Sequence, residues 1–423
     1  MVKSSEITKS YEWAKEKYAG MGVDVEKAIE TLEHVSISIH CWQGDDVGGF
    51  EKPGAELEGG GIQVTGNFKG KARTIDELRM DLDKVYSLIP GKHRLNLHAI
   101  YGEFGGKKVD RNKISTEHFS GWTEWVKERG LGLDFNSTCF SHPKADSGFT
   151  LSSTIKGIRD FWIEHVIKCR EIASYIGKNL ENPCIHNLWI PDGMKDTPVD
   201  RWIHRLILKE SLDEIYATQY DPSVMKDSLE SKLFGIGSES YVVGSHEFYM
   251  NYAQSNGKMI CLDMGHFHPT ESVADKISSL LLFFDELLIH VSRGVRWDSD
   301  HVVIQDESLQ SLADEIVRGE MLDRVHIALD YFDASMNRVG AWAAGARSTL
   351  KSFLNALLEP IDKLRDYENN GNYFARLDLI EEMKSMPLGA VWDYYCMKNK
   401  VPIGVQLMEE VMKYEKDVLE KRI

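Results

Sequence analysis

The sequence predicts a (β/α)8 barrel, also called a TIM barrel, with N-terminal helices and a C-terminal helical extension. This places the chain in the α/β class. Short apolar runs alternate with segments of helical periodicity between residues 35 and 358, as expected for parallel strands covered on both faces. Polar side chains also gather where these runs end, and catalytic groups of such barrels lie at the ends of the strands.

Eight short segments have the composition of strands. The first alternates strictly, with β-branched residues on one side. The segments span residues 35–42, 94–100, 131–135, 184–190, 227–232, 258–263, 287–291 and 325–330. A glycine-rich connection over residues 44–70 follows the first strand, and loops of that length are uncommon unless they have a function.

Helical periodicity fills the intervals between these strands. Thr74 and Glu77 have the spacing of a capping box that begins one helix, and Pro90 with Gly91 ends it. The expected helices span residues 3–18, 24–33, 74–89, 115–129, 153–176, 199–217, 247–254, 270–286, 307–319 and 338–358. The remainder of the chain after residue 360 is also predicted to be helical.

These elements divide the chain into three parts. Residues 1–34 form an N-terminal helical segment, residues 35–358 form the barrel and catalytic domain, and residues 359–423 form a C-terminal helical extension. A closed barrel does not need the extension. We therefore expect it to pack over the barrel or to contact another subunit.

Composition narrows the classes of function. The chain has 423 residues and a net charge of −16, from 50 basic and 66 acidic residues, which argues against binding to nucleic acid or anionic membranes. We find no signal peptide, and no apolar stretch approaches the roughly 20 residues of a membrane span. Six cysteines are scattered without a CxxC pair, which indicates buried, reduced thiols in a cytoplasmic protein.

Candidate site residues follow most of the predicted strands. They are His40, Trp42, His98, Asp134, Trp189, Asp192, Glu230, Lys232, Asp263, His266, His290 and Asp330. The loop after the seventh strand adds Asp298 and Asp300, which would point to the same side of an extended backbone. The structural alternatives are a solvated turn for Asp298 and Asp300, a core histidine for His290, a surface ion pair for Glu230 with Lys232, and hydrogen bonds at the barrel mouth for His98 and Asp134.

Taken together, these side chains predict a site for divalent metal ions. Carboxylates and imidazoles without a thiolate suit Mn2+, Mg2+ or Co2+ better than structural zinc. One nearly closed site would use Glu230, Asp263, His290 and Asp330. A second, with open positions for substrate and water, would use His266, Asp298 and Asp300, and two adjacent metals can orient substrate oxygens and lower the pKa of bound water.

Seven motifs resemble the L-rhamnose isomerase family, and the resemblance covers nearly the whole chain. The motifs are long and more specific than a match of spacing. They are HCWQGDD (40–46), GGGIQVTGN (59–67), NLHAIY (96–101), NLWIPDGMK (187–195), ESKLFGIG (230–237), LDMGHFHPT (262–270) and VRWDSDHV (295–302).

The resemblance implies a metal-dependent aldose–ketose isomerase that interconverts L-rhamnose and L-rhamnulose in rhamnose catabolism. It implies two divalent ions in each subunit, with Mn2+ as the usual metal and Co2+, Zn2+ or Mg2+ as substitutes. It also implies a cytoplasmic homotetramer acting on a small sugar.

The resemblance further implies a role for each matching residue. His266, Asp298 and Asp300 would hold the catalytic metal, and Glu230, Asp263, His290 and Asp330 the structural one. Lys232 would lie near O1 of the sugar, and His98 near the ring oxygen, where it suits ring opening. Trp189 and Trp42 would wall the sugar, and Asp330 is grouped with Lys232 and His98 as catalytic.

Two routes would move hydrogen between C1 and C2 of the open-chain sugar. One is a metal-assisted hydride shift, with Lys232 stabilising charge at O1. The other is an enediol route with a carboxylate as general base, and the sequence leaves both open. Rival functions are a metal-dependent nuclease, against which the acidic charge argues, a silent sugar-binding barrel, and the same chemistry on another sugar.

Overall fold

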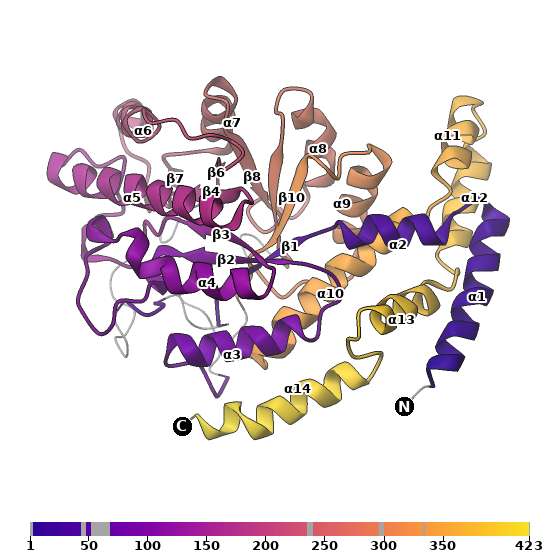
Figure 1. Cartoon of the computed structure of the whole chain (residues 1–423). Helices are drawn as coiled ribbons and strands as arrows, with labels where there is room; N and C mark the ends of the chain where they lie inside the picture. The colour runs from indigo at the N-terminus through magenta and orange to yellow at the C-terminus, as the bar shows by residue number, and fades with distance from the viewer. Residues whose placement is uncertain are drawn as a thin grey trace.

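The computed structural model describes residues 3–43, 48–51, 68–234, 240–295, 300–332 and 335–422. Eight parallel strands close into a barrel in the order β1-β2-β3-β4-β6-β8-β9-β10, and β10 pairs with β1 (Figure 1). They are β1 (Ile37–His40), β2 (Arg94–His98), β3 (Gly132–Asn136), β4 (Cys184–Trp189), β6 (Met225–Glu230), β8 (Met259–Asp263), β9 (Leu287–Val291) and β10 (Val325–Leu329). The predicted barrel is confirmed.

Two details of the strands differ from the sequence-based expectation. The fifth barrel strand spans Met225–Glu230 instead of 227–232, so Glu230 is its last residue and Lys232 follows it. A small antiparallel pair outside the barrel, β5 (Gly193–Met194) with β7 (Tyr241–Val242), was not predicted. Two-residue strands are too short to show a periodicity in sequence.

Helices surround the barrel and cover the outer faces of its strands (Figure 1). Those in the chain up to the end of the barrel are α1 (Ser4–Met21), α2 (Val25–Glu33), α3 (Ile75–Tyr86), α4 (Ser120–Glu128), α5 (Lys156–Leu180), α6 (Arg201–Ile215), α7 (His246–Ser255), α8 (Ala274–Leu281), α9 (Glu307–Arg318) and α10 (Arg338–Leu357). Among the described residues, no helix is long and apolar enough to span a membrane.

Two local predictions needed correction. The helix expected over residues 270–286 is only Ala274–Leu281, because Pro269 and a hydrogen bond between His268 and Thr270 (2.7 Å) hold a turn before it. The capping box of α3 is half formed. Thr74 accepts from the backbone of Glu77 (3.2 Å), but the Glu77 carboxylate accepts from Arg73 N (2.7 Å).

The barrel interior has an apolar layer below a polar one. Alternate residues of a strand point to the same face. The apolar layer, here called the lumen plug, consists of Ile185, Met259, Cys261, Leu288 and Ala328. Two positions further along the same chain segments stand the polar residues Asn187, Asp263, His290 and Asp330. The alternation therefore lifts these polar side chains to the carboxyl ends of the strands.

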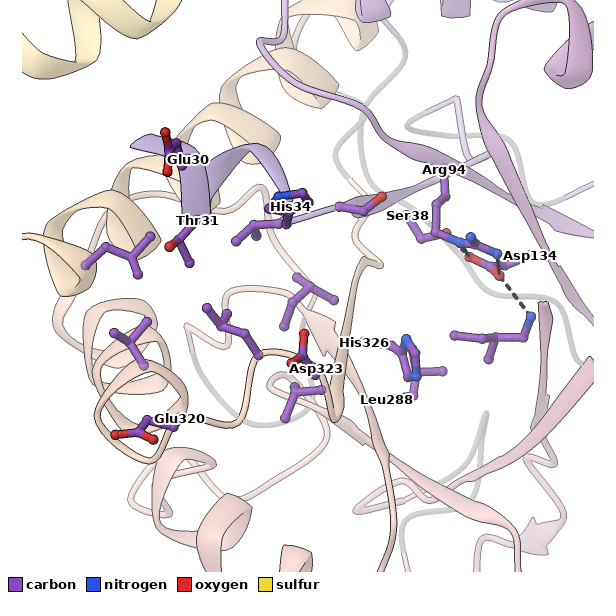
Figure 2. A pocket seen from close by; sticks show the side chains of 18 of the residues that line it. Glu30, Thr31, His34, Ser38, Arg94, Asp134, Leu288, Glu320, Asp323 and His326 are labelled. Atoms are coloured by element: carbon purple, nitrogen blue, oxygen red, sulfur yellow. Dashed lines mark hydrogen bonds and ion pairs between the residues drawn. The ribbon is translucent and has the colours of Figure 1, made fainter. Parts of the chain in front are cut away.

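A cavity of about 690 Å³ opens at the opposite, amino-terminal end of the barrel, between α2 and the segment around β10 (Figure 2). Its walls carry the Arg94–Asp134 pair, in which Arg94 donates two hydrogen bonds of 2.8 and 2.7 Å. Ser38 donates a third to Asp134 (2.6 Å). Asp134 was expected at the carboxyl-terminal mouth, and that expectation is wrong because Arg94, at the start of β2, pairs with it at this end. Residues at this end of a barrel usually stabilise the fold and take no part in catalysis.

The C-terminal extension returns to the barrel. Its helices are α11 (Ile361–Asn369), α12 (Tyr373–Met383), α13 (Leu388–Lys398) and α14 (Gln406–Asp417), followed by the turn η5 (Leu419–Lys421). α13 packs against α1, where Tyr11 and Tyr394 stack with ring centroids 3.7 Å apart. α14 then brings the C-terminus beside α3 (Figure 1).

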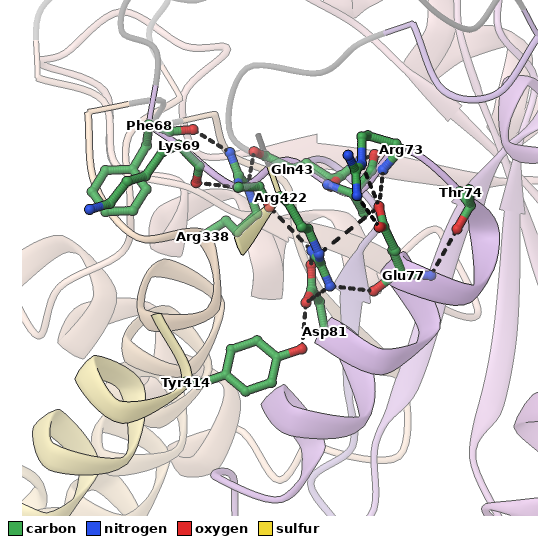
Figure 3. A network of polar contacts seen from close by, with 12 residues as sticks. Gln43, Phe68, Lys69, Arg73, Thr74, Glu77, Asp81, Arg338, Tyr414 and Arg422 are labelled. Atoms are coloured by element: carbon green, nitrogen blue, oxygen red, sulfur yellow. Dashed lines mark hydrogen bonds and ion pairs between the residues drawn. The ribbon is translucent and has the colours of Figure 1, made fainter. Parts of the chain in front are cut away.

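A buried carboxylate anchors the C-terminal end to α3. Asp81 accepts hydrogen bonds from Arg422 (2.6 and 2.8 Å) and from the hydroxyl of Tyr414 (2.6 Å), as Figure 3 shows. Asp81 is 0% exposed. A buried carboxylate needs such partners, because an unpaired buried charge is costly.

Arg338, the first residue of α10, fixes the described ends of the long connection between β1 and α3. Its guanidinium donates to the carbonyls of Gln43 (3.1 Å), Lys69 (2.8 Å) and Phe68 (2.7 Å) (Figure 3). The Gln43 side chain also pairs with the backbone of Ala72, at 2.6 and 3.2 Å. These contacts hold the chain immediately after the end of β1, where the candidate site begins.

Candidate metal and sugar site

Four side chains at the carboxyl ends of neighbouring strands form a first ligand group. Glu230, Asp263, His290 and Asp330 each offer a donor atom, and these atoms lie within 4.8 Å of one another. Nδ1 of His290 lies 3.5 Å from Glu230 Oε1, 3.6 Å from Asp263 Oδ2 and 3.5 Å from Asp330 Oδ2. The structure thus brings together all four residues expected to share one metal.

A second group shares Asp263 with the first. It consists of Asp263, His266 and Asp300. Nε2 of His266 lies 3.7 Å from Asp300 Oδ2 and 4.0 Å from Asp263 Oδ2. Asp298, the third expected ligand here, lies outside the described residues, so its place in this group stays a prediction.

Neighbouring groups orient these ligands. Asp263 Oδ1 accepts from Gly265 N (2.7 Å) and from the Ser292 hydroxyl (2.6 Å), which turns Oδ2 toward the two groups. Nδ1 of His266 donates to the carbonyl of Ser231 (3.0 Å) and lies 3.1 Å from Glu230 Oε1, while Nε2 faces Asp263 and Asp300. Supporting hydrogen bonds of this kind are typical of metal ligands.

The donor atoms of the two groups fit a cation. Within the described part of the chain, Glu230 Oε1, Asp263 Oδ2, Asp300 Oδ1 and both ring nitrogens of His290 are buried without a hydrogen-bond partner. Unpaired buried polar atoms are rare and destabilising, and several carboxylates this close repel one another. A divalent ion that prefers oxygen and imidazole donors would satisfy both conditions.

Burial and charge pull the pKa values of these groups in different directions. Burial raises the pKa of Asp263 to about 6, although the nearby His266 favours the ionised form. Burial also opposes ionisation of Glu230, but the charge of His290 and contacts with both imidazoles hold its pKa well below the ordinary value. Perturbed pKa values in a cluster such as this are typical of functional sites.

An aromatic pocket stands above the two groups. It is lined by Trp42, His98, Asn136, Ser137, Phe140, Asn187, Trp189, Glu230, Lys232, His266, Asp300, Asp330 and Phe332. Trp42 packs against His98 (centroids 4.2 Å apart) and Phe332 (5.2 Å), and its Nε1 donates to Asp330 Oδ1 (2.8 Å). The pocket can offer ring faces to C–H groups and polar atoms to hydroxyls, as sugar sites do.

Lys232 places a positive charge in this pocket. Its Nζ lies 3.8 Å from Asp300 Oδ2 and 5.1 Å from the centroid of the Trp189 ring. The structural alternative was a surface ion pair between Glu230 and Lys232, but Glu230 is not at the surface: its side chain is only 3% exposed and its Oε2 accepts from Asn187 (2.6 Å). Lys232 therefore lines the pocket beside Asp300 and Trp189.

His98 is a buried, neutral imidazole. Burial lowers the pKa of His98 to about 3, and its Nδ1 lies 3.2 Å from the Thr138 hydroxyl. It lines the pocket with Trp42 and Trp189. The sequence predicts that these three residues contact a sugar.

Two residues from the strand ends have structural roles instead. His40 is buried against Tyr331 and Trp342, and Trp342 donates to its Nδ1 at 3.2 Å; burial lowers the pKa of His40 to about 4. Asp192 accepts from the backbone and hydroxyl groups of Thr150 and Ser152, at 2.5 to 2.9 Å. Both lie outside the aromatic pocket.

Sequence reasoning missed several residues at the site, among them Asn187, Phe140, Phe332 and Cys261. Asn187 was passed over, although it stands two residues before Trp189 on the same strand face. Phe140 and Phe332 follow strands in loops, where no periodicity marks them. Cys261 was read only as a buried thiol, yet it forms a third group with Glu230 and His290, with donor atoms within 4.8 Å.

Comparisons with known proteins cover the whole chain. A family model described as L-rhamnose isomerase matches residues 5–422. An L-rhamnose isomerase of Rhodopirellula baltica is 56% identical over 422 residues, covering 100% of this chain and 98% of the relative. One of Bacteroides thetaiotaomicron is 57% identical over 422 residues and covers 100% of both chains. Among solved structures, an L-ribulose 3-epimerase has a TM-score of 0.45 at 11% identity, covering 78% of this chain and 96% of that chain.

Proposed function

The chain belongs to the L-rhamnose isomerase family and is an isomerase, and from that premise we propose that it interconverts L-rhamnose and L-rhamnulose with the help of divalent metal ions. One observation carries the metal dependence. Unpaired, buried donor atoms of two ligand groups converge on Asp263 beneath an aromatic pocket. Mn2+ is the proposed metal, because the groups are made of carboxylates and imidazoles.

The two groups would hold two ions in each subunit. Glu230, Asp263, His290 and Asp330 would hold a structural ion, and His266, Asp300 and Asp298 the catalytic one, with Asp263 touching both. A bound divalent ion supplies polarisation of the sugar's O1 and O2. The separate hydrogen bonds to Asp263, His266 and Glu230 support this assignment, since they keep one face of each ligand turned inward.

The remaining pocket residues would act on the sugar directly. A neutral His98 can exchange a proton with the ring oxygen during ring opening, because its lowered pKa leaves the imidazole unprotonated near pH 7. Lys232 would lie beside O1 and stabilise negative charge that develops there. Trp42 and Trp189 would cover the apolar face of the sugar and exclude water. Asp330, which accepts a hydrogen bond from Trp42, would fix the position of the Trp42 ring relative to the metal ligands.

We further propose that hydrogen moves as a hydride from C2 to C1 of the open-chain sugar. The O2 proton leaves as C2 becomes a carbonyl, and O1 gains a proton as C1 becomes a primary alcohol. Three carboxylates of the first ligand group support this route. Glu230, Asp263 and Asp330 each use one oxygen in a hydrogen bond and turn the other toward the ligand group, so none of the three is free to serve as a general base.

Isomerisation in D2O separates the two routes. A hydride shift keeps the migrating hydrogen out of contact with solvent, so L-rhamnulose formed in D2O should carry little deuterium at C1. Substantial incorporation at C1, measured by mass spectrometry during the first turnovers, would reject the hydride shift and favour the enediol.

A metal titration tests the function itself. Protein stripped with a chelator should be inactive on L-rhamnose and regain activity as Mn2+ is added, and the same assay with Co2+, Zn2+ and Mg2+ ranks the substitutes. Full turnover by stripped protein would reject the metal dependence. Turnover of an unrelated aldose but not of L-rhamnose would reject the substrate.

Assembly and location complete the proposal. A homotetramer is supported by α12, which has no buried residue among those described and exposes Tyr373, Phe374 and Leu377 at 61%, 75% and 57%. This agrees with residues 359–423 forming an extension that contacts another subunit. A cytoplasmic location is supported by the six cysteines of the described residues, which are buried and form no disulfide. Light scattering of the wild type and of Phe374→Asp tests the assembly, since the charge should shift it toward smaller species.

A further inference from the structure

We propose that Cys261 gives this barrel a position for a thiophilic divalent cation, such as Cd2+, held by Glu230, Cys261 and His290. The inference deepens the proposed metal centre, on which it rests for two of its three ligands. The proposed position lies at the boundary between the carboxylate layer and the lumen plug, and its thiol donor favours softer cations.

The strand register brings the three donors together. Cys261 pairs with Glu230 across β6 and β8, and Asp263, two residues on, pairs with His290 across β8 and β9. Alternate residues of β8 therefore offer a thiol one layer below a carboxylate. Glu230, Cys261 and His290 each offer one donor atom, these atoms lie within 4.8 Å of one another, and all three residues are buried.

Unpartnered atoms point to a ligand at this position. Within the described residues, Glu230 Oε1 and both ring nitrogens of His290 have no hydrogen-bond partner. Glu230 is 2% exposed and His290 is 1% exposed, so contact with bulk solvent does not account for them. The thiol thus lies near Glu230 Oε1 and the His290 ring nitrogens, buried atoms that lack a hydrogen-bond partner in the described part of the chain.

The donor types set which ion prefers which position. Thiolates favour soft cations, whereas oxygen donors favour Mn2+ and Mg2+. Binding forms a metal–sulfur bond, breaks the S–H bond and releases one proton to solvent. Glu230 and His290 belong to both the thiol group and the carboxylate group. A soft ion in the thiol position therefore draws two ligands from the oxygen-rich position and competes with Mn2+ there.

A cadmium titration of the metal-free, full-length protein tests the proposal. The probe is Cd2+ alone, followed by the ultraviolet sulfur-to-cadmium charge-transfer band. The wild type should develop the band and saturate at about one equivalent of Cd2+. Cys261→Ser should abolish it. Cys184→Ser is the matched control, because Cys184 is also a buried cysteine on a barrel strand and belongs to none of the donor groups found in the described residues.

Three outcomes decide the matter. Loss of the band in Cys261→Ser, with the band retained in Cys184→Ser, supports the proposal. A band that persists in Cys261→Ser, or Cd2+ binding by the wild type without any band, overturns it. Circular dichroism checks the fold of each variant, and if Cys261→Ser does not fold, the 113Cd chemical shift of the wild type reports whether one sulfur is bound.

The test is independent of the proposed function. Turnover of L-rhamnose with Mn2+ is measured separately on cadmium-free wild type. Failure of that assay would reject the isomerase proposal and leave the cadmium result standing. Prior loading with Cd2+ should also lower the amount of Mn2+ bound, measured by electron paramagnetic resonance, in the wild type but not in Cys261→Ser.

Discussion

Asp263 and His290 are register partners across β8 and β9, and Oδ2 of the first lies 3.6 Å from Nδ1 of the second. The same Oδ2 lies 4.0 Å from Nε2 of His266. One carboxylate oxygen thus faces both ligand groups. Parallel pairing places Asp263 beside His290, because neighbouring strands present side chains at the same height in the barrel, and the turn after β8 brings His266 back to Asp263.

Asp263→Asn should therefore damage both metal positions at once. We expect activity to fall by more than about 100-fold, since even changes to residues that only support a ligand cost 10- to 100-fold. Manganese content after gel filtration should fall as well. Ser292→Ala is the graded comparison, because it removes only the hydrogen bond to Asp263 Oδ1. Equal manganese content in wild type and Asp263→Asn would contradict the shared-ligand assignment.

Lys232→Met should separate chemistry from metal binding. The variant removes the cation that lies 3.8 Å from Asp300 Oδ2 but no proposed ligand. We expect kcat to fall by about 10²- to 10³-fold, the usual loss for a group that stabilises an oxyanion, with manganese affinity nearly unchanged. Lys209→Met, a change of a lysine that is 56% exposed, controls for the loss of charge. A kcat within a few-fold of wild type would remove Lys232 from the mechanism.

Arg422→Ala should destabilise the fold from the far end of the chain. It leaves Asp81 buried without its main partner, and such a change typically costs about 3 kcal/mol. Urea-induced unfolding measures the loss. Adding Asp81→Asn to Arg422→Ala should restore part of the stability, because the buried group is then neutral. Arg376→Ala, which breaks an exposed pair with Glu368, should have little effect.

Acid should weaken a contact at the amino-terminal end of the barrel. A hydrogen bond from His326, aided by Lys226 at 2.5 Å, lowers the pKa of Glu286 from 4.5 to about 2. Because this pKa is lower in the folded state, the stabilisation is complete above pH 4.5 and is lost as the pH falls toward 2.

Glu286→Gln should thus be less stable than the wild type at pH 7, by about 1 to 2 kcal/mol after allowance for partial exposure. The gap should narrow as the pH drops from 4.5 to 2. Urea unfolding at several pH values measures it, with Glu320→Gln, at 80% exposure, as the control. A gap that widens in acid would show that the sign is wrong.

Much of the fold and the site could be read from the sequence for a simple physical reason. Barrel strands are short apolar runs, and their ends meet at one mouth, so Glu230, Asp263 and His290 could be grouped before any contact was known. It was harder to predict at which end of the barrel the side chain of a strand residue lies. Asp134 turned out to belong to the opposite end because Arg94, on the neighbouring strand, pairs with it there.

Other features depend on residues that are distant in the chain. The role of His40 is decided by Trp342, about 300 residues later, through a hydrogen bond of 3.2 Å. The contact between Arg338 and the carbonyl of Gln43 likewise spans 295 residues. No periodicity or local motif records such pairings, whereas a strand end is marked by the residues next to it.

The lumen plug has a consequence for how the site is filled. Five apolar side chains close the barrel axis below the carboxylates, and a barrel core of this kind is packed and has no pore. The proposed ions and sugar would then share one route of entry, at the carboxyl-terminal mouth. If the proposed function holds, we expect ordered loading, with the ions entering first and a sugar bound above them holding them in place until it leaves.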